Sequence, residues 1–234
     1  MNRLAVIASV MLLPALGCHI NSTKPTRTIA LLDISGSIYP EEVDREFDEM
    51  QKLASILKRG NELILIPIMG NARNDTPGRI LRLAAPASRT PFDSDLVAFH
   101  KQAGVEIAGM KDWAKRNPTK HTDIFGSLEI ASYEINPERV PSTKLIILSD
   151  FLEDDGERNF VIDRALSQSS AARALATSQA VKHPLDLSRV AISRVRLRSK
   201  DIAALPASRQ DAVDAYWAEF LGQVNRLQPA QHAE

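Results

Sequence analysis

The sequence has almost no cysteine and no excess of charge of either sign. Cys18 is the only cysteine among 234 residues, so the chain cannot form an internal disulfide. Its 29 Lys and Arg residues balance 29 Asp and Glu residues, whereas a nucleic-acid-binding domain is normally basic. Hydrophobic residues make up 44% and charged residues 25% of the chain, the balance of an ordinary globular protein. We therefore expect a globular chain that has no nucleic-acid partner.

Motifs of the common enzyme classes are also missing. The sequence contains no G-x-S-x-G elbow, no H-E-x-x-H pair, no phosphate-binding loop and no cysteine nucleophile. Each of these motifs would place a nucleophile, a metal or a phosphate at a defined turn. Without them, we predict that the protein is not an enzyme.

The apolar segment near the N-terminus is too short to span a membrane. It covers residues 4–13, whereas a spanning helix needs roughly 20 residues. Arg3 precedes this segment, and Pro14 and small residues follow it, which is the three-part layout of an export signal. We predict a signal peptide over residues 1–17, a short linker over 18–27, one domain over 28–226 and a C-terminal tail over 227–234.

The lone cysteine lies where cleavage of that signal is expected. The segment Ala15-Leu16-Gly17-Cys18 resembles a bacterial lipobox, although Ala15 and Leu16 stand in the opposite of the usual order. An ordinary signal peptidase could also cleave after Gly17, which would leave a free thiol. We favour acylation of Cys18, with a palmitate-type chain, and a lipid-anchored place in the bacterial cell envelope, facing the periplasm or the cell exterior.

Strand-like and helix-like patterns alternate along the rest of the chain. Continuous apolar runs at residues 28–34, 62–68 and 143–150 predict buried strands, with shorter or edge strands at 78–85 and 188–198. Apolar residues at helical spacing predict helices after Pro40, from Ser94, before Ile135 and after Ser208, which is the expected N-cap. Residues 71–78 read as a loop and 159–182 as helical. This alternation predicts a doubly wound α/β fold, with a mostly parallel central sheet and helices on both faces.

Polar side chains follow two of the predicted central strands. Asp33 ends the first and Asp150 ends a later one, and Ser35 and Ser37 come shortly after Asp33. Ligands of such sheets bind beyond the carboxyl ends of the strands, where the direction of winding reverses. Hard divalent ions prefer oxygen ligands of this kind. The sequence therefore predicts a cation site if the two strands are neighbours.

In these residues the sequence resembles the von Willebrand factor A (vWA) domains, over about residues 28–224. The family's metal-ion-dependent adhesion site has a DxSxS segment, a threonine before a helix and an aspartate after a later strand. The resemblance implies that Asp33, Ser35, Ser37, Thr122 and Asp150 hold the metal. It also implies a vWA or Rossmann-like fold.

The resemblance further implies a function. Such a site holds Mg²⁺, or Mn²⁺ or Ca²⁺, and takes a Glu or Asp carboxylate of a partner protein. We therefore expect a protein-binding module for adhesion or scaffolding. Two departures concern the fold: Phe151 replaces the family's glycine after the aspartate, and about five strands are visible where six are usual.

Other interpretations of the same residues stay open. Ser35 and Ser37 could belong to a strand-to-helix turn with a capping hydroxyl, Thr122-Asp123 could cap the helix that follows, and Asp150 could be a turn aspartate. The protein would then be a metal-free structural scaffold with the same fold. A phosphatase-like hydrolase could use Asp33 as its nucleophile, but Ser35 stands where such enzymes commonly carry a second carboxylate, and a general acid is then missing.

We interpret His121 and the acidic loop near Asp154 as surface features. His121 precedes Thr122 and is expected to be a surface residue rather than a ligand. The acidic loop at Glu153, Asp154, Asp155 and Glu157 could hold a second cation, but we interpret it as a solvated loop.

The predicted anchor and the predicted metal site belong to opposite ends of one strand. Residues 19–27 join Cys18 to the amino end of the first strand and reach about 30 Å at most. Asp33 lies at the carboxyl end of that strand. We therefore expect the metal site to face away from the membrane.

Overall fold

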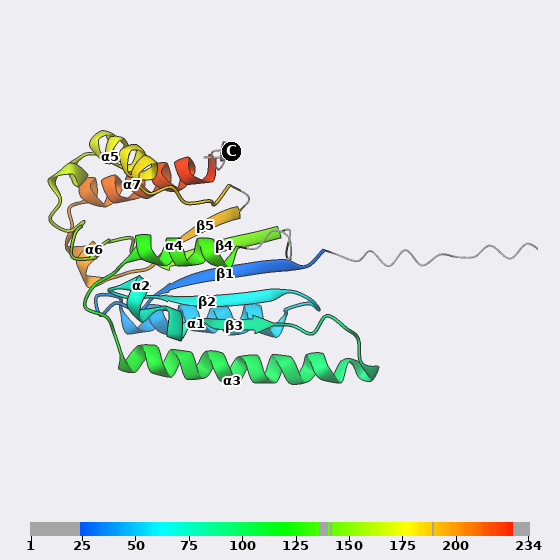
Figure 1. The fold of residues 1–234 in the computed structure, drawn as a ribbon. Coiled ribbons are helices and arrows are strands. Elements are labelled where there is room, and N and C mark those ends of the chain that lie inside the picture. The colour runs from blue at the N-terminus through cyan, green and yellow to red at the C-terminus, as the bar shows by residue number, and fades with distance from the viewer. Residues whose placement is uncertain (1–23, 136–139, 141, 189, 227–234) are drawn as a thin grey trace, which may run out of the picture.

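The computed structural model describes residues 24–135, 140, 142–188 and 190–226. The predicted signal peptide, Cys18 and the C-terminal tail lie outside these residues. The described elements form a central sheet with helices on both faces, the doubly wound α/β fold that the sequence predicts (Figure 1). Within this part of the chain, none of the helices combines the length and the apolar character that a membrane span needs.

Five strands form the sheet in the order β3-β2-β1-β4-β5. They are β1 (Thr26–Asp33), β2 (Glu62–Ile68), β3 (Leu81–Ala84), β4 (Ser142–Ser149) and β5 (Val190–Arg196). All pairs are parallel except that of β2 with the short edge strand β3. The central strand β1 begins two residues before the predicted start of the domain at Thr28.

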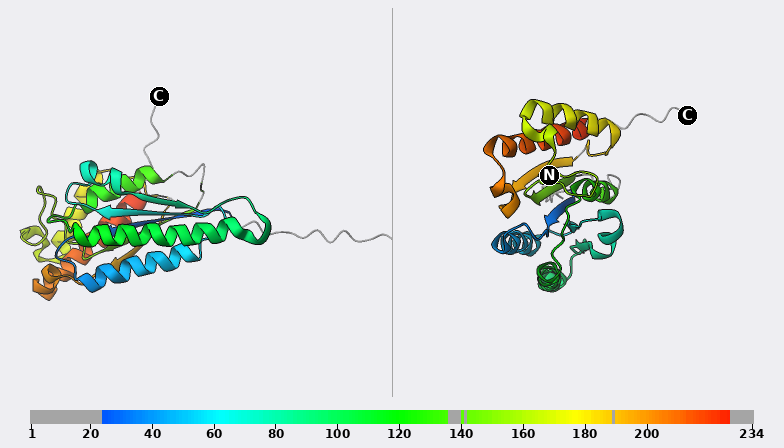
Figure 2. Two further views of the ribbon diagram at one scale, coloured as in Figure 1. Left: turned by 90° about the horizontal axis from the view of Figure 1, so that it is seen from below. Right: turned by 90° about the vertical axis from the view of Figure 1, so that its left-hand side faces the viewer.

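Seven α-helices and three short 3₁₀ turns are described. The helices are α1 (Pro40–Ser55), α2 (Ala72–Asp75), α3 (Ser94–Arg116), α4 (Ile124–Glu134), α5 (Ser169–Lys182), α6 (Lys200–Ala204) and α7 (Ala207–Arg226). The 3₁₀ turns are η1 (Pro77–Arg79), η2 (Pro91–Asp93) and η3 (Arg164–Ser167). The helices α1 and α3 cover one face of the sheet, and α4, α5 and α7 cover the other (Figures 1 and 2).

The core has two halves because side chains alternate across each strand. Along β1, Ile29 and Leu31 face the half that includes α4 and α7, whereas Ala30 and Leu32 face the half that includes α1 and α3. Trp217 and Phe220 of α7 are fully buried in the first half. Phe47 and Met50 of α1 lie in the second. The apolar stripes that the sequence predicts for α1 and α7 are therefore confirmed.

Three local predictions are wrong. The expected loop at residues 71–78 contains α2 and the start of η1, and Asn71 caps α2 by accepting a hydrogen bond from the Asn74 amide. The region 159–182 is helical only from Arg164, in η3 and then α5. Ser208 is not the cap of the last helix, because α7 already begins at Ala207. Helices of one or two turns carry too few residues for a periodic signal.

Candidate metal centre

The carboxyl ends of β1 and β4 meet at one edge of the sheet. The two strands pair in parallel, with Leu32 opposite Leu148, and the chain winds outward from them in both directions. This is the switch point at which ligands of doubly wound sheets bind. Asp33 is the last residue of β1 and Asp150 directly follows β4. The sequence prediction that these two carboxylates share an edge is confirmed.

The Asp33 side chain is completely buried and held by two hydrogen bonds. Its Oδ1 accepts from the Ser35 amide at 3.0 Å, and its Oδ2 accepts from the Ser149 hydroxyl at 2.6 Å. Burial raises the pKa of Asp33, and these hydrogen bonds lower it only in part. Asp33 therefore places a buried, fixed carboxylate next to the loop that carries the two serines.

Asp150 is buried too, but one of its oxygens has no partner. Its Oδ1 accepts from the Leu152 amide at 2.9 Å, whereas Oδ2 has no hydrogen-bond partner. Burial, and then the negative charge of Asp33, raise the pKa of Asp150 to about 7. A buried acceptor without a donor is costly, so this oxygen is suited to a proton or a cation.

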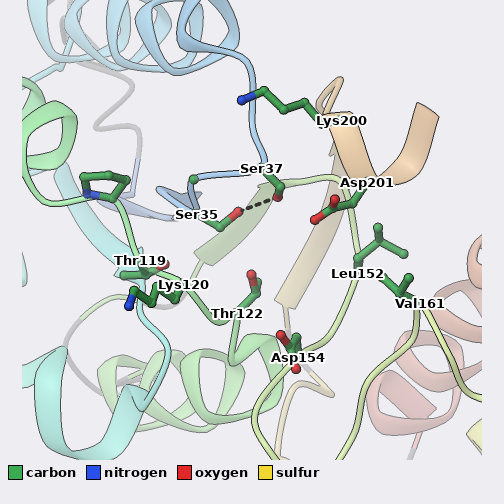
Figure 3. Close-up of a pocket in the computed structure, with 12 residues that line it drawn as sticks. Ser35, Ser37, Thr119, Lys120, Thr122, Leu152, Asp154, Val161, Lys200 and Asp201 are labelled. Atoms are coloured by element: carbon green, nitrogen blue, oxygen red, sulfur yellow. Dashed lines mark hydrogen bonds between the residues drawn. The ribbon is translucent and has the colours of Figure 1, made fainter. Parts of the chain in front are cut away.

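Ser35 and Ser37 lie side by side on the loop after β1 (Figure 3). Their hydroxyl oxygens are 3.1 Å apart. Backbone bonds hold the loop on both sides, since the Gly36 amide donates to the Thr119 carbonyl at 2.9 Å and the Lys200 amide donates to the Ser37 carbonyl at 3.0 Å. The two hydroxyls are therefore fixed by backbone contacts rather than by capping a helix.

Thr122 approaches the same cleft from the loop before α4 (Figure 3). Its backbone exchanges two hydrogen bonds of 2.9 Å with Asp154, which ties this loop to the loop after β4. The cap of α4 is Asp123, whose Oδ1 accepts from the Gly126 amide at 2.7 Å. The interpretation that Thr122-Asp123 caps this helix is thus confirmed for Asp123, and the Thr122 side chain is not the cap.

Ser35, Ser37 and Thr122, all predicted from the sequence, line a cleft of about 510 Å³. The predicted ligands Asp33 and Asp150 are buried and do not line it. Lys120, Lys200 and Asp201 line it as well and were not predicted (Figure 3). Lys120 precedes Thr122 by two residues, and Lys200 follows the strand next to β4, so their places in the chain carried a usable signal.

Phe151 adopts the backbone conformation that a glycine would adopt without strain. Its φ of 66° lies in the left-handed region. The side chain is 2% exposed and packs against Trp217, whose Nε1 donates to the Phe151 carbonyl at 2.8 Å. The loop after Asp150 therefore makes a left-handed turn despite the missing glycine, and packing of the aromatic ring stabilises it.

The interpretation of the acidic loop as solvated is wrong for one residue. Glu153 is fully buried, and its Oε2 accepts from the Ile124 amide at 2.9 Å. Asp154 lies at the rim, where its Oδ2 is 3.0 Å from Nδ1 of His121. His121 is exposed, as the sequence predicts.

Another buried acid near the cleft was not singled out from the sequence. Glu46 of α1 is 1% exposed, and neither carboxylate oxygen has a hydrogen-bond partner. Burial, followed by the charges of Asp33 and Glu42, raises its pKa well above the usual value. Glu46 lies three residues after Val43 and four before Met50, on the apolar stripe of α1, so its spacing was a usable signal that Glu49 lacks.

The donor set fits a hard divalent cation. Three hydroxyls lie on one cleft and two buried carboxylates lie at the strand ends beside them. Oxygen-only ligands with few direct charges suit Mg²⁺ and similar ions, which usually keep several waters. The partnerless Oδ2 of Asp150 is an acceptor that such an ion, or one of its waters, would satisfy.

No protein-family model matches the sequence. No curated protein is significantly similar to it in sequence. Solved structures with a similar fold include the conserved hypothetical protein BatB from Bacteroides thetaiotaomicron, at 15% identity and a TM-score of 0.40 over 73% of this chain and 65% of that chain. A von Willebrand factor type A structure from Catenulispora acidiphila aligns at 17% identity and a TM-score of 0.39, over 85% of this chain and 42% of that chain.

The manganese-loaded TRAP protein of Plasmodium vivax is also similar, at 13% identity and a TM-score of 0.37 over 79% of this chain and 65% of that chain. The aligned segment thus spans less than two thirds of each of these three structures. The topology of the chain itself establishes its fold class. The chain has a doubly wound sheet, and the Asp33-x-Ser35-x-Ser37 segment, in which the sequence resembles the vWA domains, follows its first strand.

Proposed function

We propose that this protein is a binding module that grips an acidic partner protein through a divalent cation. Ser35, Ser37 and Thr122 would hold the ion, with Asp33 and Asp150 supplying negative charge directly or through water. Mg²⁺ is the first candidate, and Mn²⁺ or Ca²⁺ would fit the same oxygens. The bound ion would offer a positive centre to a Glu or Asp carboxylate of the partner.

One observation carries the proposal. Two buried strand-end carboxylates have no cationic side chain paired with them in the described part of the chain, and three hydroxyls line the cleft beside them. Lys120 and Lys200 line the cleft together with Asp154 and Asp201, so the charged side chains of the lining balance in number. The positive centre that would attract an acidic side chain of the partner is therefore the bound cation itself.

The burial of Asp33 argues against the phosphatase-like alternative. A nucleophile must reach its substrate, but Asp33 is 0% exposed and both of its oxygens accept hydrogen bonds from the protein. The metal-free scaffold is the remaining alternative, and cation dependence of partner binding separates it from the proposal.

The test is capture of an envelope protein by the purified chain in Mg²⁺ and in chelator, followed by substitution of acidic residues in the captured protein. We expect a partner that is retained only with Mg²⁺ and is lost with Ser35→Ala/Ser37→Ala. Ser88→Ala, an exposed serine far along the chain, is the matched control and should retain the partner. If the parent chain, Ser35→Ala/Ser37→Ala and Ser88→Ala all capture the partner equally in chelator, the proposal is wrong.

The anchor is part of the same proposal. Acylated Cys18 would hold the module in the bacterial envelope, and Cys18→Ser should leave an unprocessed precursor or release soluble protein. Mass spectrometry of the processed N-terminus checks this. A mature chain without fatty acid would point to ordinary secretion.

A further inference from the structure

A second group of acidic side chains lies next to the candidate metal centre, on the other side of the Thr122 backbone. One carboxylate oxygen from each of Asp123, Glu153 and Asp155 lies within 4.8 Å of the others. The three residues come from two loops, the one before α4 and the one after β4. Acidic groups at this spacing are common without an ion, so the cluster needs independent support.

That support comes from Glu153. Its carboxylate is fully buried, and Oε1 has no hydrogen-bond partner, although Oε2 is held by the Ile124 amide. Burial raises the pKa of Glu153 well above its usual range, and the charge of Arg158 lowers it only in part. The protein thus keeps a partnerless buried acceptor within reach of two further carboxylates.

The charges around the cluster do not balance. Arg158 pairs with Asp155, with its Nε 2.9 Å from Oδ2, and its guanidinium stacks on the Phe125 ring. Arg73 and Lys182 line the cleft beside this cluster, but Arg73 pairs with Glu129 at 2.8 Å. Within the cluster, three ionised carboxylates against the Arg158 guanidinium leave two negative charges, which one divalent cation would neutralise. Asp123 is held by the amides of Gly126 and Ala72, so its carboxylate is fixed in place.

An ion could reach this cluster from solvent. Asp123, Asp155 and Arg158 line a cleft of about 760 Å³ on the outer side of α4, separate from the cleft of the candidate metal centre. Glu153 is buried behind these two aspartates. We infer that Asp123, Glu153 and Asp155 form a second divalent-cation site, and Ca²⁺ is the ion that it fits best. Ca²⁺ accepts several carboxylate ligands in flexible geometry, whereas Mg²⁺ demands near-ideal octahedral geometry and usually keeps several waters.

The site would fasten the two loops that carry part of the first centre. Thr122 directly precedes Asp123, and Asp150 lies three residues before Glu153. Two backbone hydrogen bonds between Thr122 and Asp154 already join these loops. This consequence rests on the proposed function, but the second site itself does not.

The test is calorimetric titration of Ca²⁺ into chelator-treated full-length protein that carries Ser35→Ala/Ser37→Ala, so that only the second site remains. We expect one Ca²⁺ per chain and a rise in melting temperature with added Ca²⁺. Adding Glu153→Gln, which keeps the side-chain shape and removes the charge, should weaken Ca²⁺ binding at least about tenfold. Glu49→Gln, an exposed glutamate of α1 that does not line this cleft, is the control and should bind like its parent.

A failure of the second site and a failure of the first centre give different results. If the Ser35→Ala/Ser37→Ala protein binds no Ca²⁺, or binds it equally well with Glu153→Gln, Glu153 is a buried protonated acid and the second site is wrong. If this protein binds as many cations as the parent chain, the first centre is wrong and the second site stands. Circular dichroism of each variant confirms folding before titration.

Discussion

Buried charged side chains form an ion pair at the amino end of strand β1, whereas the two aspartates at its carboxyl end have no cationic partner among the described residues. At the amino end, Arg27 and Glu62 form an ion pair of 2.6 Å, and the same guanidinium donates to the Glu134 carbonyl. At the carboxyl end, Asp33 and Asp150 are buried at 0% and 1% exposure. Across the described part of the chain, neither of them has a Lys or Arg partner.

The difference shows which end is built for a ligand. A buried ion pair with additional hydrogen bonds is a complete structural unit that needs nothing from outside. Buried carboxylates without a cation stay in place at a free-energy cost, and their raised pKa values record it. The amino end stabilises the fold, and the carboxyl end gives up stability where we propose that an ion binds.

The largest expected effect is at the paired end. Arg27→Met removes the buried guanidinium that pairs with Glu62 and donates to the Glu134 carbonyl, and it should lower the free energy of unfolding by about 3 to 5 kcal/mol. Urea denaturation measures the change. The double variant Arg27→Met/Glu62→Met removes both charges and should lose much less. A single variant within about 1 kcal/mol of wild type would mean that this pair does not stabilise the fold.

A pair of phenylalanines sharpens the comparison. Phe92 and Phe151 both have left-handed backbones, with φ of 62° and 66°, but Phe92 is 100% exposed and Phe151 is 2% exposed. Phe151→Gly relieves strain but loses buried packing, so we expect a net loss of about 2 to 4 kcal/mol. Phe92→Gly loses no packing and should change stability by less than about 1 kcal/mol. Equal effects in urea denaturation would mean that packing does not hold the turn after Asp150.

The buried acids near the carboxyl end of β1 should also make the free energy of unfolding depend on pH. The folded-state pKa of Glu46 lies well above the usual 4.5, so the folded protein keeps a proton that the unfolded chain releases. The stability from this proton is fully present below about pH 4.5 and is lost as the pH rises toward the folded-state pKa. Relative to Glu46→Gln, the metal-free wild type should therefore lose up to about 1.4 kcal/mol per pH unit above that point.

The control for this titration is Glu49→Gln, an exposed glutamate on the same helix that pairs with Lys52 at 2.6 Å. It should follow the wild-type pH profile. Denaturation midpoints between about pH 4 and 8 give the comparison. If the wild-type and Glu46→Gln profiles are parallel, the folded-state pKa of Glu46 is not raised.

The smallest expected effect concerns which end of the domain faces the membrane, and it rests on the proposed anchor at Cys18. The η2 turn with Phe92 lies at the same end of the molecule as the start of β1, since Asp93 pairs with Arg59 at 2.7 Å and Asn61 Oδ1 accepts from the Thr26 amide. Lys120 lines the cleft beyond the carboxyl end of β1, at the opposite end (Figure 3). Fluorophores on Phe92→Cys and Lys120→Cys, in anchored protein, should be quenched more strongly by lipid-borne quenchers at position 92. Stronger quenching at position 120 would reverse the proposed orientation.

The sequence predicts the strand-end positions of these carboxylates because the apolar runs before them must be buried strands. Apolar runs such as 62–68 must be buried in a sheet, and a parallel sheet puts its carboxyl ends at one edge. The adjacency of β1 and β4 then brings Asp33 and Asp150 together. Only the identity of the neighbouring strands had to come from the structure.

The sequence does not predict which acids are buried. Glu153 looks like a surface residue of an acidic loop, and its burial depends on contacts between elements far apart in the chain. Glu46 lies on the apolar stripe of α1, but helical spacing does not show that its carboxylate stays without a partner. The positions of Lys120 and Lys200 can be read from the sequence, whereas their joint lining of one cleft depends on where the loop before α4 and the start of α6 meet.

The most direct test of the central claim is titration of Mg²⁺ into chelator-treated protein that carries Glu153→Gln, so that only the first centre is observed. Calorimetry should find one Mg²⁺ per chain, and the same titration of Ser35→Ala/Ser37→Ala in this background should find none. Ser88→Ala in the same background should bind like its parent. Equal Mg²⁺ binding with and without the two hydroxyls of Ser35 and Ser37 would contradict the account.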